Sequence, residues 1–176
     1  VVAQPVLNKS LVSVAAPTSG TPGHFDAVFR LQVRTTIFGG AFGISTYDRL
    51  DLPSRLGSAF VSVVGAPAIV YFSPTSLPGA INPGFDGVLN NVVASGAVMP
   101  ANDTVIYEIR VEVNPYAIGA PAILSNNFAV GFNNPQQFVF SNYVDIPNCW
   151  TDCQMTCNNQ VQISMNTHCE AEILPS

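Results

Sequence analysis

The sequence predicts an all-β fold, an antiparallel β-sandwich, with a closed β-barrel as the alternative. Two stretches, residues 25–35 and Thr104–Val113, alternate apolar and polar side chains with a period of two residues. This alternation is typical of strands with one buried and one solvated face. Thirteen glycines and fourteen prolines are spread along the 176 residues and leave little room for long helices. About eight short runs separated by turn residues complete the pattern of a sandwich.

The two alternating stretches are expected to be adjacent antiparallel strands at the centre of one sheet. Arg30 and Arg34 lie on the polar face of the first stretch, and Glu108 and Glu112 lie on the polar face of the second. Opposite charges on neighbouring strands stabilise their pairing by roughly 0.2–1 kcal/mol each. These four side chains therefore indicate that the two strands are partners.

The other expected elements are shorter, and glycine, proline or asparagine residues bound most of them. Residues 6–14 form a first strand, in which Leu7 and Leu11 face inward. Later strands are expected at residues 44–50, 59–64, Ala68–Phe72, 126–132 and 137–144, the last two as a hairpin. Residues 52–56 are expected to form one helical turn, and residues 73–87 a long loop. Residues 88–98 are apolar, but Asn90, Asn91 and Gly96 interrupt them, so their structure stays open.

Charged residues make up only 10% of the chain, against about 25% in an average domain. The net charge of −5 argues against a nucleic-acid partner and against an anionic membrane surface. Residues 56–102 contain one charged side chain, Asp86, and residues 114–144 contain none. Prolines interrupt both runs, so neither reads as a transmembrane helix. Such an uncharged surface either contacts another molecule or is solvated by Asn, Ser, Thr and Gln side chains.

The chain is expected to divide into a sandwich domain over residues 1–147 and a cysteine-rich tail over residues 148–176. Two short strands in the tail, at residues 161–165 and 171–174, would form a hairpin that is marginal without a covalent link or a partner. The sequence starts at Val1 without a methionine or a charged leader, as expected of a processed or excised chain.

All four cysteines lie in the tail, at Cys149, Cys153, Cys157 and Cys169. Their spacing leaves two interpretations, a zinc site and disulfide bonds. Because the spacing differs from standard zinc motifs, disulfides that stabilise a small extracellular hairpin are the preferred interpretation. The pairing cannot be deduced from the sequence, although a bond between Cys157 and Cys169 would close the two-stranded unit.

No catalytic signature is present, and the chain is expected not to be an enzyme. His24 follows a Pro-Gly turn without a partner motif, so it is interpreted as a solvated turn histidine. Asp48 and Asp51 are close enough in sequence to form an acid pair, or to bind calcium with Asp86 or Asp103. Local turn hydrogen bonds are the preferred role for these aspartates, and no cofactor is expected.

Five segments carry a family resemblance: VLNKSL, FDAVFRLQVRTT, STYDRLDLPSRLGSAFVSVVGAP, TVIYEIRVEV and SNNFAVGF. Their succession over most of residues 6–132 resembles the conserved repeat domain of large bacterial cell-surface proteins. That family has a lysine-bearing first strand, a D-x-L segment and a closing N-x-A segment; here Arg34-Thr35-Thr36 stands where an asparagine is usual. The tail resembles the opening of a further module that often follows such repeats. The resemblance implies an immunoglobulin-like sandwich, export, a role in surface adhesion or architecture, and no catalytic residues.

These observations predict an extracellular or cell-surface structural or adhesive module. We expect it to assemble into a fibre by exchange of a terminal strand, because an unpaired strand edge invites pairing with another chain. The candidate assembly residues are Val6, Leu7, Leu11 and Val12 at the N-terminus and Val161, Ile163 and Ile173 in the tail. The expected partner is a second copy of the chain. Alternatively, the first strand pairs within its own domain and the tail leads into a neighbouring module.

Two other functions stay open. A carbohydrate-binding or spacer module of a secreted adhesin would expose aromatic side chains toward glycans, and the candidates are Tyr47, Tyr71, Tyr116, Tyr143 and Trp150. A secreted hydrolase is the third function, and no motif supports it. Neither nucleic-acid binding nor insertion into a membrane is expected.

Overall fold

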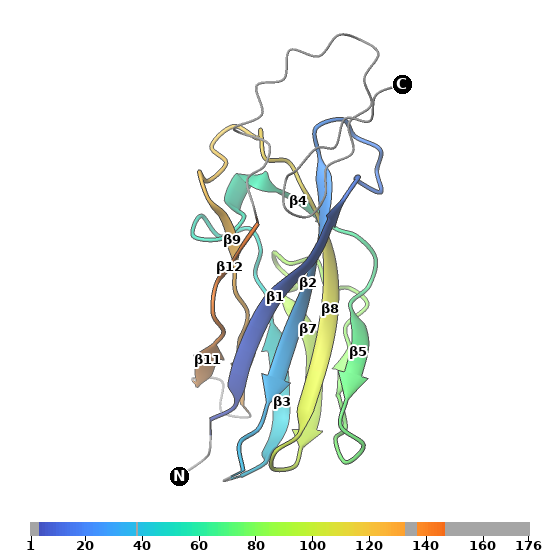
Figure 1. Cartoon of the computed structure of the whole chain (residues 1–176), viewed down its shortest axis with the longest axis vertical. Coiled ribbons are helices and arrows are strands. Elements are labelled where there is room, and N and C mark those ends of the chain that lie inside the picture. The colour runs from blue at the N-terminus through green and yellow to red at the C-terminus, as the bar shows by residue number, and fades with distance from the viewer. Residues whose placement is uncertain (1–3, 38, 133–136, 147–176) are drawn as a thin grey trace, which may run out of the picture.

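A computed structural model describes residues 4–37, 39–132 and 137–146 of the chain (Figure 1). These residues form antiparallel β-strands and a short 3-10 helix, as the alternation and the turn residues predict. The elements are β1 (Val6–Ala15), β2 (Phe25–Arg34), β3 (Ala41–Tyr47), η1 (Gly57–Ala59), β4 (Phe60–Val63), β5 (Ala68–Phe72), β6 (Ala80–Ile81), β7 (Val92–Met99), β8 (Thr104–Val113), β9 (Leu124–Asn126), β10 (Ala129–Gly131), β11 (Phe138–Phe140) and β12 (Val144–Ile146). Among them, no helix has the length and apolar character needed to span a lipid bilayer.

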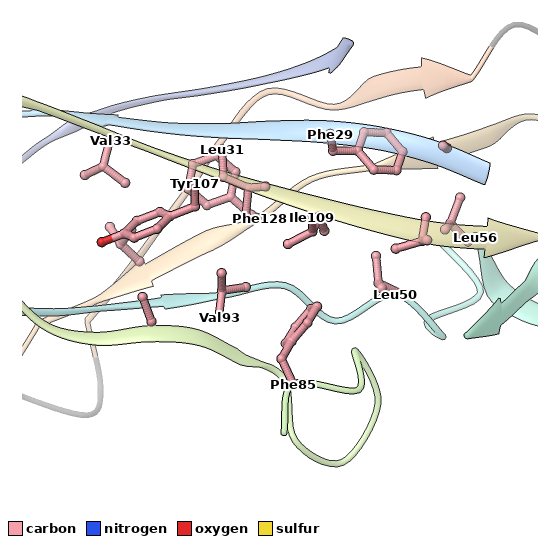
Figure 2. Close-up of a cluster of buried hydrophobic side chains, with 14 of the residues drawn as sticks. Phe29, Leu31, Val33, Leu50, Leu56, Phe85, Val93, Tyr107, Ile109 and Phe128 are labelled. Atoms are coloured by element: carbon pink, nitrogen blue, oxygen red, sulfur yellow. The ribbon is translucent and has the colours of Figure 1, made fainter. Parts of the chain in front are cut away.

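The strands pair into two five-stranded sheets and one two-stranded sheet. The first sheet has the order β1-β2-β8-β4, and β5 also pairs with β8. The second has the order β11-β10-β3-β7-β6, and β9 pairs with β12. The two large sheets enclose one apolar core, to which β2 and β8 contribute from one side and β3 and β7 from the other (Figure 2). The all-β, sandwich-like class predicted from the sequence is therefore confirmed.

The core is built from the apolar positions of the alternating strands. Phe29 and Leu31 of β2 and Ile109 of β8 are fully buried, and Val93 of β7 lies on the opposite side of the core (Figure 2). Tyr107 is buried among them, and its hydroxyl donates a hydrogen bond to the carbonyl oxygen of Pro78 at 2.5 Å. Burial raises the pKa of Tyr107 to about 12. The phenol therefore stays neutral and holds the loop before β6 against the core.

The predicted adjacency of β2 and β8 is confirmed over ten paired positions, and one arginine of β2 forms an ion pair with a glutamate of β8. Arg30 lies opposite Glu108, with 3.2 Å between Arg30 Nε and Glu108 Oε2. In an antiparallel pair, a step forward on one strand is a step back on the other. Arg34 therefore lies opposite Thr104, far along the ladder from Glu112, and it donates a hydrogen bond to Asn102 Oδ1 at 3.2 Å.

Other expected elements differ from the structure at their bounds. The strand expected at 44–50 begins earlier, at Ala41, and the helical turn expected at 52–56 is a turn followed by η1. The expected long loop 73–87 contains β6, and the ambiguous stretch 88–98 contains most of β7. The expected hairpin near the end of the domain is represented by β10 and β11, which pair antiparallel. The expected cysteine tail, with Trp150, Val161, Ile163 and Ile173, lies outside the described residues.

Candidate functional site: a buried lysine, aspartate and asparagine

Lys9, the single lysine of the chain, is fully buried in the middle of β1. It shares the inward-facing phase of the strand with Leu7 and Leu11, both of which pack against the core. Its Nζ lies 4.7 Å from the centre of the Phe29 ring. A buried ammonium group is costly unless it is paired, so the position requires a partner.

Asp48, which directly follows β3, is that partner. Its side chain is also fully buried, and its Oδ2 accepts a hydrogen bond from Lys9 Nζ. The backbone N–H of Asp48 donates to the carbonyl oxygen of Asn91 at 2.9 Å, which fixes the chain where it leaves the second sheet. The pair therefore joins β1 of one sheet to the end of β3 in the other.

Two further polar side chains complete the cluster. Asn126, the last residue of β9, is fully buried, and its Nδ2 lies 3.4 Å from Asp48 Oδ2. One guanidinium nitrogen of Arg55 lies 3.7 Å from Asp48 Oδ1 and donates to the backbone carbonyl of Arg49. The turn that carries Arg55 is closed by a hydrogen bond from its backbone N–H to the carbonyl of Leu52 at 2.8 Å. Asp48 thus lies between an amine, an amide and a guanidinium group.

Some buried atoms in and beside the cluster have no hydrogen-bond partner among the residues that the structure describes. They include Asp48 Oδ1 and the side-chain oxygens of Asn126 and Asn127. Leaving a buried polar atom unsatisfied costs roughly 1–3 kcal/mol, so such atoms are uncommon in a core. Their occurrence together near Asp48 and β9 indicates that this polar cluster has a role other than packing of the core.

Burial moves both members of the ion pair toward their neutral forms. Desolvation lowers the pKa of Lys9 to about 8, although the attraction of Asp48 opposes that shift. Desolvation likewise raises the pKa of Asp48, against the attraction of Lys9 and Arg55. A neutral lysine amine is a nucleophile, and a protonated carboxyl is a proton donor. The cluster therefore holds a potential nucleophile, a proton carrier and a carboxamide in direct contact around Asp48 Oδ2.

Sequence reasoning missed this site, although the pattern of the first strand contains a signal for it. Lys9 occupies an apolar phase of the first strand, between Leu7 and Leu11. Three of the segments that carry the family resemblance, VLNKSL, STYDRL and SNNFAV, supply Lys9, Asp48 and Asn126. Residues more than a hundred positions apart thus meet at one point of the core.

The structure corrects the expectation for His24, which is not a solvated turn residue. Its Nδ1 lies 2.7 Å from Glu112 Oε1, and its side chain is 17% exposed. Ser19 Oγ donates to the same carboxylate oxygen at 2.7 Å. The hydrogen bonds from Ser19 and His24 lower the pKa of Glu112. The Pro-Gly turn folds His24 back onto the end of β8, where Glu112 is buried.

The aspartates considered as an acid pair or a calcium site have separate partners. Asp51 accepts a hydrogen bond from Arg49 Nε at 2.9 Å, while Asp48 faces Lys9. Asp86 accepts from backbone N–H groups of its own loop, as expected for turn chemistry. Asp103 accepts from two hydroxyls of the loop after β5. Within the described ranges, no three His, Cys, Asp or Glu side chains are grouped to hold a metal ion.

An open hollow lies next to the cluster. Arg55 and Asn127 line it together with Phe140 and Tyr143, and the remaining lining residues are Leu52, Ser54 and Ser141. The hollow therefore combines two aromatic side chains with a guanidinium group and a carboxamide. A comparison of the sequence with protein-family models finds no match, and a comparison with curated proteins finds none either.

Proposed function

We propose that this chain is an extracellular structural module of immunoglobulin-like topology that associates with copies of itself into a surface fibre or layer. The observation that carries the proposal is the placement of exposed apolar side chains on two edge strands, β5 and β11. The resemblance to surface repeat domains supports the extracellular location. The low charge of the chain supports contact between its copies.

The first apolar edge is β5. Within the described residues β5 pairs only with β8, so its other side is free of a neighbouring strand. Val70, Tyr71 and Phe72 are each more than 40% exposed, and Leu77 just beyond the strand is 64% exposed. An exposed edge strand with large apolar side chains is a surface for contact with another chain.

The second apolar edge is β11. It pairs with β10 and has no further strand beside it in the described part of the chain. Phe138 packs edge-to-face on Tyr47, with 5.4 Å between ring centres, and it remains 46% exposed. Phe140 and Tyr143 continue the exposed aromatic surface. Aromatic side chains of this kind contribute strongly at protein interfaces.

The two edges lie on opposite flanks of the molecule, β11 at the left and β5 at the right of Figure 1. Both fall within the charge-poor runs of the sequence, residues 56–102, which contain Asp86 as their one charged side chain, and the uncharged residues 114–144. Contact between two different surfaces of identical chains propagates unless rotation closes it into a ring. Association of one edge with the other would therefore produce a fibre or a layer.

Terminal strand exchange remains a proposed way to link modules end to end. In the single chain, β1 pairs with β2 along its whole length. This pairing agrees with the alternative in which the first strand stays within its own domain. The outer side of β1 is occupied at Lys9, because the Asn142 side chain accepts from its backbone N–H at 2.9 Å and donates to its carbonyl at 3.0 Å. An added donor strand would have to displace Asn142. Lateral contact through β5 and β11 needs no such displacement.

Glycan binding is the second candidate, and the hollow beside Arg55 favours it. Phe140 and Tyr143 offer aromatic faces there, and Arg55 and Asn127 offer polar groups. Such a combination suits a sugar, whose ring has both apolar and hydroxyl-bearing faces. A glycan array separates the two proposals, since binding there with a monomeric protein would support the second alone.

The test of self-association compares three variants by light scattering and negative-stain electron microscopy. Tyr71→Lys and Phe140→Lys place a charge on each proposed contact edge and should reduce assembly by at least about tenfold in association constant, since a few residues dominate an interface. Leu89→Lys is the matched control, because Leu89 is 91% exposed in the loop between β6 and β7 and belongs to neither edge strand. A monodisperse monomer at high concentration, or equal effects of all three substitutions, contradicts the proposal.

A further inference from the structure

We propose that the chain carries an autocatalytic cross-linking site, in which Lys9 Nζ forms an amide bond with the side chain of Asn126 and Asp48 carries the proton. The product is a covalent link between β1 and β9. The proposal rests on the geometry of the buried cluster and is independent of the proposed self-association.

The first support is proximity. Lys9 Nζ and Asn126 Nδ2 approach the same oxygen, Asp48 Oδ2, so one carboxylate holds the amine and the carboxamide beside each other. All three residues are fully buried. Holding two reactants in place raises their effective concentration by many orders of magnitude, which can replace an external catalyst.

The second support is the set of unsatisfied oxygens. A stable core polar site normally satisfies every atom, yet Asp48 Oδ1 and Asn126 Oδ1 have no hydrogen-bond partner in the described part of the chain. A half-turn of the Asn126 amide would bring its oxygen to Asp48, whose protonated form could then donate to it. Such a bond polarises the amide carbonyl toward attack. The ion pair alone is a weak source of stability, so stability does not explain why the polar cluster is kept.

The reaction balances without any added reagent. The lone pair of the neutral Lys9 amine attacks Cγ of Asn126 and forms a tetrahedral intermediate. Asp48 takes a proton from the attacking nitrogen and passes one to Nδ2. The bond between Cγ and Nδ2 breaks, ammonia leaves, and a secondary amide remains. Asp48 ends in its starting form, and no oxidant, metal or cofactor is consumed.

The electrostatics of the site favour these protonation states. Burial lowers the pKa of Lys9 to about 8 and raises that of Asp48, so proton transfer from the ammonium to the carboxylate becomes easier than in water. The same burial keeps water away from the intermediate, which prevents hydrolysis of the amide in place of aminolysis. Phe29 lies against Lys9 Nζ and limits the directions the amine can take.

Asn126 is the reacting amide, and its neighbour supplies a matched control. Asn127 is also buried and also has an unsatisfied side-chain oxygen. It lines the hollow beside Arg55, whereas Asn126 contacts Asp48. Asn126→Ala should abolish the cross-link completely, and Asn127→Ala should leave it intact.

The test is the intact mass of the purified full-length chain, measured after reduction and denaturation. The unsubstituted protein should be lighter than its sequence by one molecule of ammonia. Lys9→Met, Asp48→Asn and Asn126→Ala should each have the mass of their sequences. Tandem mass spectrometry should locate the link between the peptides that contain Lys9 and Asn126.

The single lysine gives a second readout, because a cross-linked chain has no free lysine amine after unfolding. An amine-reactive reagent should then label only the N-terminus, and trypsin should not cleave after Lys9. An unsubstituted protein with its full sequence mass and a reactive Lys9 overturns the proposal. Ammonia lost with Lys9 still reactive, or a denaturant-resistant ladder of multimers, also overturns it. These outcomes are read on the unsubstituted protein and do not depend on whether a variant folds.

Discussion

Single residues in this protein take roles that their type alone does not indicate. The only lysine lies in the core, although lysine is among the residues least often buried. His24, after a Pro-Gly turn, contacts a buried glutamate. In both positions a carboxylate compensates for burial, Asp48 for the lysine and Glu112 for the histidine. The composition could not show these pairs, because their members lie far apart in the sequence.

Glu112 should make the stability of the fold depend on pH in the acid range. Its pKa in the folded state is lowered from the ordinary value of 4.5 by hydrogen bonds from Ser19 and His24. A lowered pKa contributes stability above the unfolded value, and that stability is lost as the pH falls through the folded value. We expect the urea midpoint to fall below about pH 4.5 less steeply in Glu112→Gln than in the unsubstituted protein.

Glu108→Gln is the control for this measurement. Glu108 lies on the same strand, but its ion pair with Arg30 is partly exposed and therefore weak. The urea midpoint of Glu108→Gln should fall at acid pH as steeply as that of the unsubstituted protein. If Glu112→Gln and the unsubstituted protein lose stability in parallel as the pH falls, the role assigned to Glu112 is wrong.

At the scale of elements, a strand could be predicted from the sequence where its own alternation of apolar and polar side chains is unbroken. β2 and β8 alternate without interruption, so their bounds and their partnership were predictable. The stretch that contains β7 was ambiguous because Gly96 and two asparagines break its pattern. Its hydrogen-bonded pairing with β3, which the local sequence does not show, makes it a strand. β6 has only two residues, and a strand so short depends on its neighbour rather than on its own sequence. The lysine site escaped prediction for the same reason, since β1, β3 and β9 form it only together.

The loop before β6 depends on one glycine, and its replacement should be costly. Gly79 has φ +82, and a Cβ built there would lie 2.6 Å from the carbonyl oxygen of Ser95. Gly79→Ala should destabilise the fold by roughly 3 kcal/mol or more, from left-handed strain together with the clash against β7. Gly20 has φ +73 with open space around it, so Gly20→Ala should cost about 1–2 kcal/mol from strain alone. Urea unfolding measures both, and equal losses would show that the clash with β7 has no effect.

At the scale of the whole molecule, the two proposals assign complementary roles to the polar cluster and to the apolar edges. The proposed link between Lys9 and Asn126 joins the first strand to the ninth, so tension entering at β1 would reach β9 without unfolding the strands between them. The exposed edge strands β5 and β11 are not themselves joined by this link, and they are the surfaces through which we propose contact with neighbouring copies. A module that carries load needs both internal strength and lateral contact. The uncharged surface runs fit the second need, and the buried lysine fits the first.

The cross-link should also raise the thermodynamic stability of the whole fold, and the two adjacent asparagines measure by how much. Linking positions 9 and 126 closes a loop of roughly 120 residues, which removes about 4–5 kcal/mol of conformational entropy from the unfolded chain in the loop-closure treatment. Asn126→Ala and Asn127→Ala both remove a buried carboxamide with an unsatisfied oxygen, so their local costs are similar. Only Asn126→Ala should lose the contribution of the link. We expect its free energy of unfolding to fall below that of Asn127→Ala by about 4–5 kcal/mol, with a larger urea m-value because the unlinked chain exposes more surface. Equal stabilities and equal m-values for the two variants would show that residues 9 and 126 are not covalently joined.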